Sequence, residues 1–249
     1  MTVAGSTAAR WFRRHATAVE PRLRLVCLPH AGGAATFFHT WGGAFGDDVE
    51  VVATRYPGRQ DRIAEPCVDT MEELADAVSE ALLPLLDTPL ALFGHSMGAS
   101  LAYEVALRLE SRHGVRLAGL YVSGREAPHR VTPKDVHLRD DAALVAEVRR
   151  LGGADAALLD DPDLRELVLP AIRSDFRVAG TYRASSATPV GCPVVGYLGD
   201  DDPNVTVSDM ALWSEVATGG FALRVIPGGH FYLVPEQAAL IEDLAGRLG

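Results

Sequence analysis

The chain has 249 residues, of which 48% are apolar and 22% charged, and its formal net charge is −10. This acidic balance disfavours non-specific binding to nucleic acid or to an anionic membrane, and no stretch approaches the roughly 20 apolar residues that span a bilayer. The length suits one large α/β domain or two small ones. The run Trp11–Arg14 is not followed by a long apolar segment, so we expect no secretory signal. Cys27, Cys67 and Cys192 lack metal-ligand spacing, which predicts buried free thiols in a reducing cytoplasm.

Strand and helix patterns alternate along the chain. The first half predicts strands at 22–28, 49–55, 90–94 and 117–123, a helix from the Thr70–Glu73 capping box to about residue 86, and a helix at 97–112. The second half predicts strands at 193–198 and 222–226 and a closing helix at 235–248 that starts at Pro235. Alternation of this kind is typical of a mostly parallel sheet with helices on both faces.

One segment, residues 132–182, breaks the alternation because it has no strand pattern. Helices are expected at 142–151 and 164–182, joined through Gly152-Gly153 and the acidic turn at 160–163. An insertion here would lie over the carboxyl edge of the sheet, where open α/β folds bind ligands. We therefore predict a helical lid; an ordinary crossover with extra helices is the alternative. The chain has no repeats or linkers, so a single domain over 1–249 with this lid is expected.

The run Gly94-His95-Ser96-Met97-Gly98 follows an apolar strand and precedes a helical pattern. That context is typical of a nucleophile elbow. Glycine is needed at 94 and 98 because a side chain there would collide with the neighbouring strand or helix. The turn lifts Ser96 above the sheet, and the following helix points its N-terminus at the reaction centre. Ser96 is therefore the predicted nucleophile; a serine without a role in a glycine-rich loop is the alternative.

A serine hydroxyl is a weak nucleophile that needs a base, and the base needs an orienting acid. The order serine, acid, histidine along the chain points to His230, which follows the last strand in Pro227–Phe231. His30 and His95 are expected near the site, but at motif positions where the backbone matters more than the side chain.

The acid is expected after the strand at 193–198, where Asp200, Asp201 and Asp202 are consecutive. Three adjacent carboxylates cannot all point at one imidazole. Pro203 stiffens the turn after Asp202 and favours that residue, and Asp201 is the alternative.

Acyl transfer also needs hydrogen-bond donors for the developing oxyanion. One is expected to be the backbone N–H of Met97, the residue after the nucleophile. The second is expected from the loop 29–34, whose small residues allow close approach of a substrate, and Ala31 is the candidate.

Five segments together resemble the type II thioesterases of polyketide and nonribosomal peptide synthesis. They are Leu28–Gly33, Tyr56–Arg62, Phe93–Ala99, Gly199–Val205 and Gly228–Phe231. The resemblance implies an α/β-hydrolase that removes stalled or misprimed acyl groups from the phosphopantetheine arm of a carrier protein. It also implies Asp202 as the acid, Ala31 and Met97 as the oxyanion donors, and residues 132–182 as a flexible lid. No metal or organic cofactor is needed for this chemistry, and we expect a monomer.

Two other functions fit parts of this pattern. A general carboxylesterase or lipase would share the triad, and a catalytically silent binding protein would need no intact triad. An acidic carrier protein would be repelled by an acidic enzyme unless charge is segregated. We therefore expect a basic docking patch formed by Arg59, Arg62, Arg173 and Arg177, with internal ion pairs as the alternative interpretation of these arginines.

Overall fold

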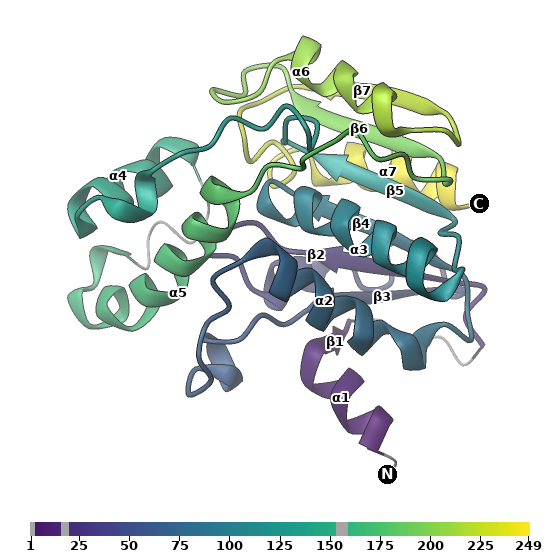
Figure 1. Cartoon of the computed structure of the whole chain (residues 1–249), viewed down its shortest axis with the longest axis horizontal. Helices are drawn as coiled ribbons and strands as arrows, with labels where there is room; N and C mark the ends of the chain where they lie inside the picture. Colours follow the sequence, from purple (N-terminus) through teal and green to yellow (C-terminus); the bar gives the residue numbers. More distant parts are fainter. Residues whose placement is uncertain (1–2, 16–19, 153–158) are drawn as a thin grey trace.

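The computed structural model describes residues 3–15, 20–152 and 159–249. They form one seven-stranded sheet in the order β1-β3-β2-β4-β5-β6-β7 (Figure 1). The strands are β1 (Phe12–Arg14), β2 (Leu23–Leu28), β3 (Val49–Thr54), β4 (Leu90–His95), β5 (Gly119–Ser123), β6 (Val194–Gly199) and β7 (Phe221–Ile226). β1 runs antiparallel to β3, and every other neighbouring pair in this sheet is parallel. The predicted fold class, a mostly parallel α/β sheet, is confirmed.

Helices cover both faces of the sheet. The helices among the described residues are α1 (Val3–Trp11), α2 (Met71–Leu82), α3 (Met97–His113), α4 (Asp141–Leu151), α5 (Pro162–Thr181), α6 (Val207–Ala211) and α7 (Gln237–Leu248). Short 3-10 turns occur at Ala35–Trp41, Gln60–Arg62, Leu83–Leu85, Val136–Leu138 and Leu212–Val216. In Figure 1, α2 and α3 lie on the face of the sheet nearer the viewer, and α7 lies on the far face.

The strands are apolar because the central ones are buried on both sides. In β2, Val26 and Leu28 join the core under α2 and α3, whereas Leu25 and Cys27 join the core under α7. Successive side chains of a strand point to opposite faces, so a fully buried strand reads as a continuous apolar run. This pattern fits the prediction of β4, β5 and β6, which are buried along their whole length, whereas the edge strand β7 is only partly buried.

Several features differ from the sequence-based expectation, and the short helix α6 is one of them. The helix α1 and the edge strand β1 were not expected. The closing helix begins at Gln237 rather than at Pro235. Separate turns occupy the preceding residues, with the N–H of Val234 donating to the carbonyl of Phe231 and the N–H of Glu236 to that of Tyr232.

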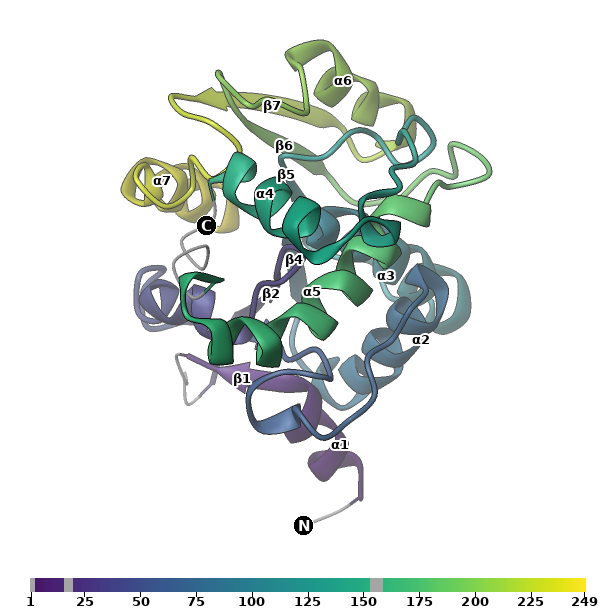
Figure 2. The same cartoon turned by 90° about the vertical axis from the view of Figure 1, so that its left-hand side faces the viewer.

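The helices α4 and α5 project from one end of the sheet, at the left of Figure 1 and in front of the strands in Figure 2. They share a small apolar cluster of their own, separate from the two sheet cores, which consists of Val136, Leu144, Val145, Leu159, Leu169 and Ile172. Residues 153–158 of the segment predicted as a lid lie outside the described residues. Movement of this segment as a lid stays a prediction. Within the described ranges, no helix is long and apolar enough to cross a membrane.

Candidate active site

The turn between β4 and α3 has the geometry expected of an elbow. Ser96 has a φ of 55° and a ψ of −117°, which residues with a side chain rarely adopt. A Cβ on Gly94 would lie 2.0 Å from the carbonyl oxygen of Gly98, and one on Gly98 would lie 2.0 Å from that of Leu28. Only glycine fits at either position, because backbone atoms on both sides leave no room. The N–H of Ser96 donates to the carbonyl of Ser123 at 2.8 Å, which ties the turn to β5.

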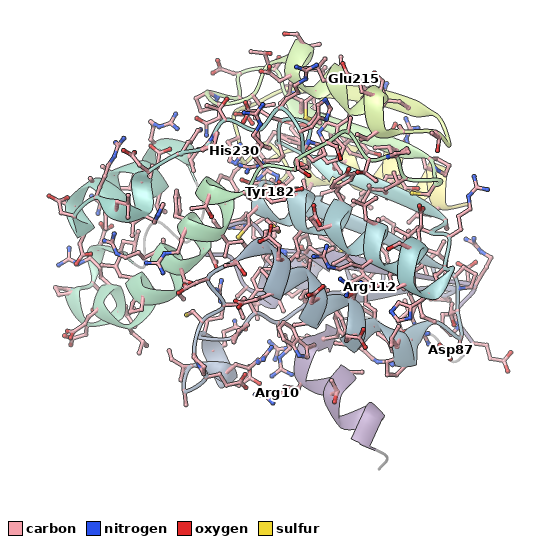
Figure 3. All side chains as sticks on the ribbon, in the orientation of Figure 1. Arg10, Asp87, Arg112, Tyr182, Glu215 and His230 are labelled. Atoms are coloured by element: carbon pink, nitrogen blue, oxygen red, sulfur yellow. The ribbon has the colours of Figure 1, made fainter. Side chains whose placement is uncertain are left out.

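His230 and Asp202 form a buried pair at the carboxyl edge of the sheet (Figure 3 labels His230). The Nδ1 of His230 lies 2.7 Å from Oδ2 of Asp202, and the two side chains are 3% and 0% exposed. Oδ1 of Asp202 accepts hydrogen bonds from the N–H groups of Asn204 and Val205, at 2.9 and 3.3 Å. The carboxylate is thereby fixed in place, and the imidazole is held with Nε2 as the nitrogen left to accept a proton.

The other two carboxylates of the acidic turn do not reach the imidazole pair. Oδ1 of Asp200 accepts from the N–H of Gly228 at 2.8 Å, and Asp201 is exposed. A Cβ on Gly199 would lie 2.3 Å from the carbonyl oxygens of both Gly228 and Gly229. This close backbone approach brings the loop after β6 against the loop after β7, and it places Asp202 rather than Asp201 beside the histidine.

The two predicted oxyanion donors lie near the elbow. Met97 is the first residue of α3, and Ala31 lines the same cavity as Ser96. Within the part of the chain that the structure describes, the N–H groups of Ala31 and Met97 donate no hydrogen bond to another protein group. Unpaired donors at a helix N-terminus and in a tight loop suit a developing negative charge.

The cavity beside Ser96 has a volume of about 60 Å³. Its lining includes His230 and Phe231 from the sheet edge and Glu147, Phe176 and Gly180 from the α4–α5 region. Arg125 and Lys134 also line it and were missed by the sequence analysis. Burial lowers the pKa of both cations. Arg125 could have been found from its position two residues after β5, because ligands bind at the carboxyl ends of parallel strands.

His30 and His95 surround His230 with neutral rings. Burial, followed by the nearby His230 and Arg59, lowers the pKa of His30 to about 3. Burial also lowers the pKa of His95 well below its usual value. The His95 ring centroid lies 4.8 Å from that of His230, and Nδ1 of His95 lies 2.9 Å from Oγ of Ser123. Both rings pack beside the base without contacting a carboxylate, so His230 is the one of the three that has an acid partner.

The predicted basic docking patch is wrong for two of its four arginines. Arg59 is 11% exposed and paired with Asp175, and Arg62 is 5% exposed and paired with Glu65. Arg173 and Arg177 are 27% and 45% exposed, and they are paired with Asp141 and Asp69, respectively. The alternative of internal ion pairs therefore describes Arg59 and Arg62, whereas the ion pairs of Arg173 and Arg177 lie at the surface.

Ser96 lies at a strand-to-helix elbow after β4, whereas Asp202 follows β6 and His230 follows β7. This order and arrangement define an α/β-hydrolase. Among the described residues, no group of three or more histidine, cysteine, aspartate or glutamate side chains is arranged to hold a metal ion.

The family model of the thioesterase domain matches residues 23–248. The chain belongs to the thioesterase family, whose members hydrolyse thioesters.

Individual relatives are similar over nearly the whole chain. Thioesterase PikA5 of Streptomyces venezuelae is 46% identical over 239 residues, which cover 96% of this chain and 85% of that protein. The gramicidin S biosynthesis protein GrsT of Aneurinibacillus migulanus is 34% identical, covering 98% of this chain and 95% of that protein. The structure of the type II thioesterase BorB from the borrelidin biosynthetic cluster superposes with a TM-score of 0.89 at 44% identity, covering 96% and 98% of the two chains.

Proposed function

We propose that the protein is a type II thioesterase that hydrolyses stalled or misprimed acyl groups from the phosphopantetheine arm of carrier proteins in polyketide or nonribosomal peptide synthesis. The observation that carries the chemistry is the buried Asp202–His230 pair, because His230 lines the same cavity as Ser96 at the elbow. The assignment of the substrate class is supported by the similarity to BorB, named a type II thioesterase of a biosynthetic cluster, and to GrsT, named for gramicidin S biosynthesis.

The proposed reaction has two steps. Ser96 Oγ attacks the thioester carbonyl while Nε2 of His230 takes the hydroxyl proton, and Asp202 stabilises the imidazolium. The N–H groups of Ala31 and Met97 bind the oxyanion. The C–S bond then breaks, the pantetheine thiol leaves with the proton from His230, and an acyl-serine remains. His230 next takes a proton from water, whose hydroxide adds to the acyl carbon, and returns it to Ser96 as the free acid is released.

The proposal includes a monomeric enzyme that acts in the cytoplasm. The three cysteines are free thiols, with Cys27 and Cys192 buried, which fits a reducing compartment. The acyl-carrying partner is a carrier protein, and neither nucleic acid nor a membrane takes part. The α4–α5 segment acts as the lid over the acyl site.

A hydrolysis panel tests this function. One acyl group is offered on a holo carrier protein, on pantetheine and as an oxygen ester, to the wild type and to Ser96→Ala. We expect the highest kcat/KM for the carrier-bound thioester and a loss on the order of 10⁴- to 10⁶-fold in the variant. Mass spectrometry should find the acyl adduct on Ser96.

Two outcomes would favour the other functions. A preference for the oxygen ester would point to a general carboxylesterase. Absence of turnover on every substrate, together with no labelling of Ser96 by a fluorophosphonate, would point to a binding protein.

A further inference from the structure

The loop that carries Ala31 is held at three backbone positions by side chains from outside it. The Oη of Tyr56 donates to the carbonyl of Pro29 at 3.0 Å. Nη1 of Arg59 donates to the carbonyl of Gly33 at 2.9 Å. The N–H of Gly32 donates to Oδ2 of Asp175 at 2.7 Å. These attachments lie on both sides of Ala31, so they fix the direction of its N–H.

Two of the three attachments belong to one buried ion pair. Nη1 and Nη2 of Arg59 donate to the two carboxylate oxygens of Asp175 at 2.6 and 2.7 Å. The side chains are 11% and 5% exposed. Burial disfavours the charged guanidinium, but Asp175 outweighs that effect, and the pKa of Arg59 lies above its usual value. A bidentate pair of this kind fixes both position and angle.

Asp175 reaches the loop from α5, the helix that covers the acyl cavity. Ile172, one turn earlier on α5, packs on the same loop, with its Cγ1 3.1 Å from the position of a Cβ on Gly32. Farther along α5, Arg177 pairs with Asp69, but these side chains are 45% and 50% exposed. Exposed ion pairs contribute little, so the buried Arg59–Asp175 pair is the strong polar attachment of α5 to the Ala31 loop.

We propose that Arg59 and Asp175 form a clasp that couples the docking of α5 to the conformation of the Ala31 loop. They are positioning residues for the oxyanion donor, and this role rests on the proposed function of the site. With α5 docked, the clasp holds the peptide groups of Gly32 and Gly33 and thereby aims the N–H of Ala31. When α5 lifts to admit or release an acyl-pantetheine arm, Gly32 and Arg59 lose the carboxylate. Attack on the carbonyl then waits until the cover has returned.

Two substitutions weaken the clasp in different ways. Asp175→Asn keeps the size and one acceptor oxygen but removes the charge. Arg59→Lys keeps the charge but replaces the planar fork by a single ammonium. Because misaiming an oxyanion donor raises the barrier to attack, we expect kcat for acyl-pantetheine to fall about tenfold to a hundredfold, with KM little changed. Arg59→Lys should retain more activity than Asp175→Asn.

The matched control is Arg177→Gln, which breaks the exposed ion pair of the same helix two residues beyond Asp175. It should leave kcat for acyl-pantetheine unchanged. The second readout is the rate at which a fluorophosphonate reacts with Ser96, because its phosphoryl oxygen occupies the oxyanion position. This rate should fall in both clasp variants and not in the control. Thermal unfolding of each variant establishes that the protein is folded under the assay conditions.

Wild-type rates in folded clasp variants, for both hydrolysis and phosphonylation, would overturn the proposal. A raised KM with unchanged kcat and unchanged phosphonylation would also overturn it, since the pair would then serve substrate entry alone. If Asp175→Asn does not fold, Arg59→Lys decides. If the wild type reacts with the fluorophosphonate but does not hydrolyse acyl-pantetheine, the proposed function fails, and the phosphonylation rates still test the clasp.

Discussion

The carboxyl edge of the sheet and the α4–α5 region face each other across the cavity, but they are held in place by different forces. At the sheet edge, backbone packs on backbone, as at Gly98 beside Leu28 and at Gly199 beside Gly228. Helix α5 is held by ion pairs, by a small apolar cluster and, toward its C-terminus at Val178, by the sheet core under α2 and α3. The side chains at the sheet edge thus rest on close backbone contacts, whereas the N-terminal part of α5 rests on ion pairs and a small apolar cluster.

The α4–α5 region also leaves apolar side chains in solvent. Leu164 and Leu167 of α5 are 40% and 54% exposed. Regions with little buried apolar surface open at a lower free energy than the core. The comparison therefore predicts that changes at the sheet edge abolish activity or folding, and that changes in α4–α5 alter rates by smaller factors.

The largest expected effect is at the acid. Asp202→Asn should lower kcat on the order of 10⁴-fold, because an amide can favour the wrong imidazole tautomer and cannot stabilise the imidazolium. The control is Asp200→Asn, which alters only a hydrogen bond accepted from the N–H of Gly228, and it should lower kcat far less. Steady-state kinetics on acyl-pantetheine measure both. A larger loss in Asp200→Asn or in Asp201→Asn would reassign the acid.

A glycine pair tests the backbone packing. A Cβ on Gly98 would meet backbone atoms that cannot move aside, so Gly98→Ala should lower the free energy of unfolding by about 3 kcal/mol or more. A Cβ on Gly246, in α7, would meet no atom within 4 Å, and Gly246→Ala should raise that free energy by about 0.5–1 kcal/mol. Urea unfolding of the two variants measures the difference. Equal stabilities would contradict the steric account of the elbow.

A cross-link tests the mobility of the cover. Ser174 of α5 contacts Val68 and Asp69 in the loop before α2, next to Cys67, so Ser174→Cys is chosen to form a disulfide between α5 and that loop. Cys27 and Cys192 are buried and should not interfere. We expect oxidation to slow turnover of the carrier-bound thioester about tenfold, a barrier increase of about 1.4 kcal/mol. The same variant after reduction is the control, and unchanged turnover with a verified cross-link would argue against opening.

The smallest effect at neutral pH is expected at His30, between the sheet edge and the α4–α5 region, and it grows as the pH falls. The pKa of His30 falls from about 6.5 to about 3 on folding, mainly through burial. The neutral ring therefore stabilises the fold above pH 6.5, and this contribution is lost as the pH falls toward 3. His30→Gln should reduce the loss of thermal stability between pH 6.5 and pH 4. His39→Gln, at an exposed histidine, is the control, and identical profiles in all three proteins would contradict the prediction.

Local sequence patterns predicted the parallel strands and the pair Asp202 and His230, whose side chains lie 2.7 Å apart at the sheet edge. Continuous apolar runs mark doubly buried strands, and glycines mark the turns where backbones meet. The sequence did not predict β1, because a strand of three residues is too short to show an alternating pattern of apolar and polar side chains. The start of the closing helix was predicted two residues too early, at Pro235, because proline suits both a first helical turn and the turn before a helix.

The arginines could not be assigned from sequence for a different reason. The partner of Arg59 is 116 residues away in the chain, and nothing near either residue marks the pairing. Whether a charge is solvated or buried depends on which elements pack together. The sequence therefore suggested that Arg59 and Arg62 are exposed, whereas in the fold both are nearly buried and paired with carboxylates.

The backbone ladder between β6 and β7 continues past both strands, with the N–H of Asp200 bonded to the carbonyl of Ile226 and that of Asp201 to the carbonyl of Gly228. The distance between Asp202 and His230 is thus set by the distance between β6 and β7. The α4–α5 segment enters the chain between β5 and β6, outside this ladder. An exchange of that segment would therefore leave the β6–β7 ladder in place, provided that the replacement keeps a carboxylate opposite Arg59 and a partner for Asn204, which Arg150 of α4 contacts at 2.6 Å.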